Sequence, residues 1–174
     1  LAADGIAALA FVNTLLAPAA TLLVWAFLDR SRTGKPTAVG VATAIVVGLV
    51  AITPAAGFVS PMSSLIIGAI AAVPSYFVLQ WLNSTRLDDS LDVFAAHGVG
   101  GATGAILTGV FASAALSGAP GLLDGNPGAV LIQAIAVLAV FVYSAVGTVI
   151  ILKLVGLVVP LRGTPQDEGV GMDI

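Results

Sequence analysis

The chain has 174 residues, of which 59% are hydrophobic and only 9% are charged, and its formal net charge is -3. An ordinary soluble domain has roughly 25% charged residues, so this composition excludes a soluble globular protein. The absence of cysteine excludes a disulfide framework, a thiolate metal site and a cysteine nucleophile. A bilayer accepts so much apolar surface provided that backbone hydrogen bonds are satisfied internally, so we expect an all-α fold, a polytopic transmembrane helical bundle.

Apolar runs of about 20 residues match a hydrocarbon core of roughly 30 Å. They predict five membrane spans, at about residues 6–28, 37–53, 61–82, 93–115 and 128–158. The fifth run would rise about 45 Å as a helix, so it must tilt or project beyond the membrane. Residues 1–163 therefore form the expected transmembrane region and 164–174 a cytoplasmic tail. The start of the chain does not resemble a signal peptide, so we expect Leu1 to be a cut end.

The basic residues predict the orientation of these spans. The loops at 53–60 and 116–127 contain no lysine or arginine, and all six basic residues fall on the other side: Arg30, Arg32, Lys35, Arg86, Lys153 and Arg162. Basic residues concentrate in cytoplasmic loops. We therefore expect an integral protein of the cell (plasma or inner) membrane, with the N-terminus of the chain outside and its C-terminus in the cytoplasm.

The first and third spans contain residues that are unusual in apolar helices. Asn13 and Thr14 are better explained as donors of hydrogen bonds between helices than as substrate ligands. Pro18 and Pro74 each remove a helix hydrogen bond, which predicts a kink in each helix.

Three acids precede the fourth span, namely Asp88, Asp89 and Asp92. They could form a metal site or an acid and base pair. Aspartate before a helix also caps free backbone N–H groups and complements the positive end of the helix dipole, and we favour this interpretation.

His97 is the single histidine and the best candidate for chemistry. Helical rise from Arg86 would place it on the order of 15 Å from the cytoplasmic boundary, where an ionisable ring is unfavourable in lipid. A structural histidine bonded to a neighbouring helix is one explanation. A neutral imidazole that donates from one nitrogen and accepts at the other also suits a pore, and we favour the pore.

Glycines cluster directly after this histidine, at Gly98, Gly100, Gly101 and Gly104. They lack the spacing of a dinucleotide-binding loop and follow no strand. Gly100 and Gly104 form a G-x-x-x-G pattern, which lets a second helix approach closely, so packing is favoured over ligand contact.

Residues 88–101 (DDSLDVFAAHGVGG) resemble the penultimate helix of the ammonium transporters, the Amt/Mep/Rh family. Three further segments resemble the same family in the same order, at residues 8–14, 34–37 and 48–59. The resemblance implies that the five spans are helices seven to eleven of an eleven-helix transporter built from two inverted repeats.

The resemblance also implies a function and its residues. Ammonium or ammonia would cross a hydrophobic pore in each subunit of a homotrimer, and His97 would be the second of two facing histidines. Val93 would line the cytoplasmic side of the pore, Thr43 would lie near the inner exit, and Asp92 would be structural. We expect no enzymatic activity, no cofactor, no metal and no nucleic-acid partner.

Some family features fall outside the chain or differ within it. The first pore histidine and the outer aromatic gate are absent from this sequence, and Ala44 and Val46 replace small residues that are usual around Thr43. The tail at 165–174 resembles the family's acidic tail, which often meets a PII-type regulatory protein. An ammonium sensor with the same fold is the alternative function, and a structural remnant that only joins oligomers is a third.

Overall fold

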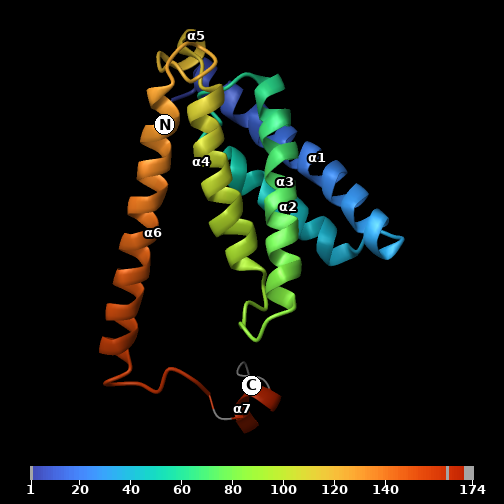
Figure 1. The fold of residues 1–174 in the computed structure, drawn as a ribbon, viewed down its shortest axis with the longest axis vertical. Helices are drawn as coiled ribbons and strands as arrows, with labels where there is room; N and C mark the ends of the chain where they lie inside the picture. The colour runs from blue at the N-terminus through green and yellow to red at the C-terminus, as the bar shows by residue number, and fades with distance from the viewer. Residues whose placement is uncertain (1, 164, 171–174) are drawn as a thin grey trace. The chain divides into compact units, whose positions relative to one another are not determined.

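The computed structural model describes residues 2–163 and 165–170, and all regular elements within them are helices (Figure 1). The helices are α1 (Gly5–Thr33), α2 (Ala38–Ile52), α3 (Pro61–Asn83), the π-helix η1 (Phe94–Val99) with its continuation α4 (Gly100–Phe111), α5 (Ala114–Ser117), α6 (Gly128–Val155) and α7 (Pro165–Val170). The expected all-α class is confirmed. The chain divides into two compact units after Val137, within α6. Of the expected tail, residues 164 and 171–174 lie outside the described residues.

Four segments in the described part of the chain are long and apolar enough to cross a membrane: α1, α3, the continuous helix from Phe94 to Phe111, and α6. The remaining apolar helix, α2, has only 15 residues. At 1.5 Å per residue it is about 22 Å long, shorter than the hydrocarbon core of roughly 30 Å.

Helix α1 continues past its apolar run because both of its ends are capped. The Asp4 side chain accepts a hydrogen bond from the Ala7 N–H at 2.9 Å. At the other end Gly34 has a φ of 83° and its N–H donates to the Arg30 carbonyl at 3.0 Å. Glycine adopts this left-handed conformation without a steric penalty, so the helix ends there rather than at the first charged residue.

Three glycines bring helix backbones into direct contact. A Cβ atom on Gly48 would overlap Pro18 of α1, one on Gly68 would overlap the Ala17 carbonyl, and one on Gly104 would overlap the Ala51 carbonyl. These pairings make α2 antiparallel to α1, α3 parallel to α1, and α4 parallel to α2. Small residues at helix contacts are the usual means of packing helices in a membrane.

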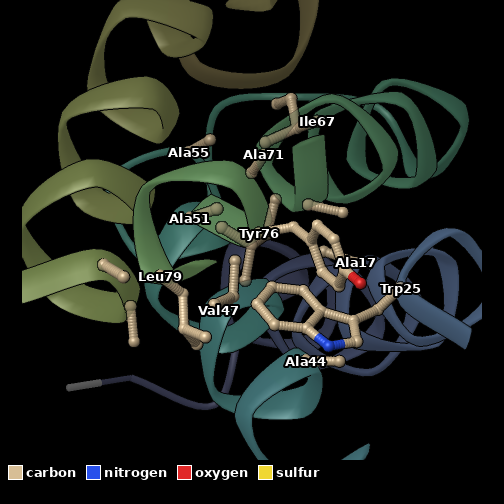
Figure 2. Packing of buried hydrophobic residues seen from close by; sticks show 14 of the residues in the cluster. Ala17, Trp25, Ala44, Val47, Ala51, Ala55, Ile67, Ala71, Tyr76 and Leu79 are labelled. Carbon is tan, nitrogen blue, oxygen red and sulfur yellow. The ribbon is translucent and has the colours of Figure 1, made fainter. Parts of the chain in front are cut away.

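The buried core of the first unit lies mainly among α1, α2, α3 and η1, and half of its residues are alanines, which surround one aromatic pair (Figure 2). The rings of Trp25 and Tyr76 meet edge to face, with centroids 5.0 Å apart and an interplanar angle of 80°. Edge-to-face contact suits the charge distribution of aromatic rings. The pair fills the space that the surrounding small side chains leave open.

Buried polar groups join the helices at defined points. The Asn13 amide donates to the carbonyls of Ala56 and Val59, both at 2.8 Å, and Ser64 donates to the Asn13 carbonyl at 2.9 Å. Asn13 therefore joins different segments, as the sequence indicates. The expectation for Thr14 was wrong, because its hydroxyl donates to the Ala10 carbonyl of its own helix at 2.7 Å.

The two prolines lie inside continuous helices. Neither α1 nor α3 is interrupted at Pro18 or Pro74. Pro18 is buried where Gly48 approaches α1, so its ring takes part in the packing.

Candidate functional site

The helix pairings define two ends of the first unit. Residues 34–37 and 84–92, which carry Lys35 and Arg86, lie at one end, called the basic end below; residues 53–60 and 112–127 lie at the opposite end. At the basic end the buried carboxylate of Asp29 accepts from the backbone N–H and the hydroxyl of Thr37, at 3.3 and 3.4 Å. Thr37 in turn caps α2 by accepting from the Gly40 N–H at 2.9 Å. This chain of contacts fixes the start of the helix that carries Thr43.

The acids before η1 do cap its helix, but the cap is Asp89. Its two carboxylate oxygens accept from the N–H groups of Val93 and Phe94, both at 2.9 Å. Asp92 instead makes the turn into the helix, with a φ of 55° and its N–H donating to the Asp89 carbonyl at 3.0 Å. Aspartate tolerates this left-handed conformation better than most residues. Asp88 accepts from the Ser90 hydroxyl at 2.8 Å.

Asp92 is half-buried at this turn, outside the helical segment. Burial raises the pKa of its carboxyl group above the usual range, and the nearby negative charge of Asp89 raises it further. The electrostatics of the turn therefore favour a proton on Asp92 more than on a free aspartate.

The helix that carries His97 begins in π form. In the segment Phe94–Val99 the hydrogen bonds span five residues, and the Gly100 N–H donates to the carbonyl of Ala95. Such π segments are rare and occur frequently at functional sites. Nothing in the spacing of the apolar residues indicates this irregularity.

The π segment buries its two alanines and leaves His97 and its neighbours on the exposed side. Ala95 and Ala96 are buried against α2 and α3, while His97 and Gly98 are exposed and Val93 and Phe94 are 49% and 46% exposed. These four outward residues are called the His97 face below. Its composition is one imidazole among apolar groups.

Thr43 lies at the level of this face along the bundle. Val47 of α2 is next to Gly100, and one turn earlier come Thr43 on α2 and the pair Ala96 and His97 on η1. Thr43 is half-buried. Thr43 is thus about level with His97, and Val93 lies one helical turn nearer the basic end.

The depth of His97 in the membrane stays a prediction, but the continuous helix expected from Arg86 to His97 was wrong. No helix is present between Ser84 and Asp92. His97 lies one turn into its helix, about 6 Å from the first helical residue, because four residues rise about 1.5 Å each.

The glycines after His97 differ in what they contact. Gly104 meets the α2 backbone directly, whereas a Cβ on Gly100 or Gly101 would lie at ordinary contact distances of 3.5 Å or more from its neighbours. A Cβ on Gly98 would lie 3.2 Å from the Phe94 ring, so that ring folds over Gly98 beside His97. Phe94 is thus a further neighbour of the site, and the signal for it in the sequence is an aromatic residue three positions before the histidine.

A cavity of about 270 Å³ lies at the opposite end of the first unit and does not include His97. Its lining is mostly apolar, with Thr108 and Gln133 among the polar residues. Among the described residues no group of three or more histidine, aspartate or glutamate side chains is placed to hold a metal ion. The His97 face is therefore the candidate site.

Comparison with known proteins decides the family. The family model described as Ammonium Transporter Family matches residues 1–174. This chain belongs to that family. An ammonium transporter of Aquifex aeolicus is 49% identical over 97% of the chain, and one of Bacillus subtilis is 41% identical over 98%. The chain spans 40% and 43% of the length of these two relatives.

Solved structures share the fold of this chain. The crystal structure of Saccharomyces cerevisiae Mep2 matches 92% of this chain and 38% of its own, with a TM-score of 0.84 and 31% identity. A structure described as a sensor Amt protein matches 98% of this chain and 42% of its own, with a TM-score of 0.87 and 26% identity. The apolar helices and this membership make the chain part of an integral membrane protein.

Proposed function

We propose that this chain forms one wall of a pore through which the complete protein moves ammonium or ammonia across a cell membrane. The observation that carries the proposal is the His97 face, an exposed imidazole on a π segment surrounded by Val93, Phe94 and Gly98. Family membership supports it, because the relatives named above are ammonium transporters.

The chemistry of the face suits this substrate. A bare ammonium ion loses much hydration energy in an apolar passage, whereas neutral ammonia loses far less. A neutral imidazole offers one donor and one acceptor to a small polar molecule without placing a full charge in the passage. Hydrated metal cations gain no comparable compensation, so such a pore discriminates against them.

The neighbouring residues take roles consistent with their positions. Val93 lines the passage on the basic end side of His97, and Thr43 offers a hydroxyl at the same level. Asp92 acts on the helix start rather than on the substrate. The second wall, with the facing histidine, belongs to the part of the relatives' length that this chain does not cover.

The assembly and its orientation are part of the same proposal. We place the basic end at the cytoplasm, because basic loops face that side. A homotrimer with one pore in each subunit, lipid around it and a PII-type regulatory protein at the cytoplasmic tail complete the proposed partners.

An ammonium sensor is the second candidate, because a sensor Amt protein shares the fold over almost all of this chain. Such a protein would bind ammonium at the His97 face and pass a change of conformation to a cytoplasmic domain. Binding of ammonium without flux across the membrane distinguishes the sensor from the transporter.

Reconstitution of the complete protein into liposomes tests transport. We expect an ammonium-induced current or methylammonium uptake well above that of empty liposomes. His97→Ala should change the selectivity or the rate at least about tenfold while the protein still assembles, since removal of a positioned polar group from a reacting or binding centre commonly has effects of this order. Tyr143→Ala on α6, where the ring is 81% exposed, is the control and should transport normally. Flux no greater than that of empty liposomes would contradict the proposal.

A further inference from the structure

Two buried side-chain atoms of the described residues have no hydrogen-bond partner, namely Asn13 Oδ1 and Ser75 Oγ. Ser75 lies on α3 and is completely buried. A hydroxyl in apolar surroundings is unfavourable unless it is paired, and most buried polar groups in proteins do find a partner. The position of Ser75 therefore calls for an explanation.

Ser75 lies where the π segment passes into α4. A Cβ on Gly100 would be 3.5 Å from Ser75 Oγ and 3.6 Å from Val47 Cγ1, so α2, α3 and the helix of His97 meet at this point. The hydroxyl is thus beside the last turn of the π segment and not at the lipid-facing surface.

The π segment leaves an acceptor at the same junction. The Gly100 N–H donates to the carbonyls of Ala95 and His97, which lie five and three residues earlier. In an α-helix it would donate to Ala96, four residues earlier. The carbonyl of Ala96, a residue that is only 3% exposed, therefore lacks its α-helical donor. The unpaired hydroxyl of Ser75 is beside Gly100, and the carbonyl of Ala96 lies one turn earlier on the same helix.

We propose that Ser75 is a positioning residue for His97. Its hydroxyl donates to the Ala96 carbonyl, after a rotation of the side chain or through one bridging water, and so holds Phe94–Val99 in its π register. Buried waters commonly bridge polar groups of this kind. The role assigned to His97 rests on the proposed function, whereas the register of the segment does not.

The register matters because it decides which side chains face outward. A change from π to α spacing moves the segment by one residue, which is a rotation of about 100° relative to α4. Ala96 would then take the place of Ala95, Ala95 would leave the core, and His97 would turn into the buried position that Ala96 now occupies. Ser75 thus determines the direction in which the His97 side chain points, without contacting the substrate.

Hydrogen exchange of the complete protein tests the register without any measurement of transport. In Ser75→Ala we expect amides 98–101 to exchange at least about threefold faster, which is the effect of losing one ordinary hydrogen bond. The matched control is Ser64→Ala, since Ser64 is equally buried on α3 but donates to the Asn13 carbonyl. This control should leave amides 98–101 unchanged.

Transport in liposomes provides the second readout. Ser75→Ala should shift the pH dependence of flux, whereas Ser64→Ala should not. If Ser75→Ala does not fold, Ser75→Cys keeps the volume with a weak donor and should give an intermediate exchange rate. Unchanged exchange at 98–101 together with higher thermal stability in Ser75→Ala would overturn the proposal. It would show that the Ser75 hydroxyl makes no stabilising hydrogen bond. Faster exchange in a protein without flux would instead support the register and reject the proposed transport.

Discussion

Two regions, the contacts among α1, α2, α3 and α4 and the start of η1, hold their backbones by different means. In the first region Gly48, Gly68 and Gly104 bring backbones together with no side chain between them, and Asn13 bonds two carbonyls of another segment. At the start of η1 a single carboxylate, that of Asp89, holds the first turn. The helix of His97 is therefore fixed by backbone contact at Gly104, whereas its first turn is held by the Asp89 cap.

This difference separates the support of the site from the site itself. Backbone contact at Gly104 sets where the helix lies, while the cap and the π segment set how its first turns are rotated. Substitutions at the close contacts should therefore prevent folding. Substitutions at the helix start should leave a folded protein with an altered site. The variants below act on each region in turn.

Gly104→Leu should have the largest effect. Its side chain would enter the space of the Ala51 carbonyl, and a backbone atom cannot move aside without shifting α2. Overpacking typically costs about 1–3 kcal/mol and occasionally more, and overlap with a backbone atom puts this variant at the upper end. Gly147→Leu on α6, where a Cβ meets nothing within 4 Å, is the control. Size-exclusion chromatography should show loss of folded protein for the first variant only; equal yields would contradict the close contact.

Asn13→Leu should be the next most severe. It removes the donors of two hydrogen bonds and leaves the carbonyls of Ala56 and Val59 unpaired, at a cost of about 1–3 kcal/mol. Thr14→Val is the control, because that hydroxyl bonds only to its own helix. We expect a lower melting temperature for Asn13→Leu than for Thr14→Val, and similar values would show that the amide does not hold residues 53–60.

Asp89→Ala should weaken the start of η1 by about 1 kcal/mol, the usual effect of losing a helix cap. Asp88→Ala is the matched control, because Asp88 bonds only the Ser90 hydroxyl and no helical N–H. Hydrogen exchange of residues 93–97 should quicken in the first variant and not in the second. Equal exchange in both would assign the cap to another group.

Asp92→Asn should have the smallest effect, visible as a pH dependence. A raised folded pKa means that the folded protein binds the proton more tightly, so stability falls as pH rises from the unfolded value of about 3.9 through the folded pKa. The asparagine variant keeps a residue that tolerates the left-handed turn and loses this fall. Melting curves from pH 3.5 to 7 check it; an identical fall in both proteins would remove Asp92 as its source.

Much of the fold follows from the sequence because the bilayer imposes a simple rule. A segment of about 20 apolar residues must be a helix, so the composition alone predicts the all-α class that the structure shows. The close contact at Gly104 also follows from the spacing of small residues. The continuation of α1 to Thr33 did not follow, since the hydropathy pattern ends before the caps that determine the helix.

The sequence predicts which residues form the candidate site but not how they are arranged. The motif around His97 indicates the residue, and the charge pattern near Asp88–Asp92 indicates a cap. Which aspartate caps the helix depends on the direction of the chain at the turn, and the π segment depends on how Ala95 and Ala96 fit against α2 and α3. Neither choice is encoded in local periodicity.

The shortness of α2 bears on how the chain enters the membrane during synthesis. A helix of about 22 Å cannot cross the hydrocarbon alone, and the residues after it include two carbonyls that accept hydrogen bonds from the Asn13 amide. Insertion of residues 38–60 as a separate segment would leave these groups unpaired in lipid. Helix α1 must therefore still be beside the insertion site when this stretch emerges, so that the two segments enter as a pair.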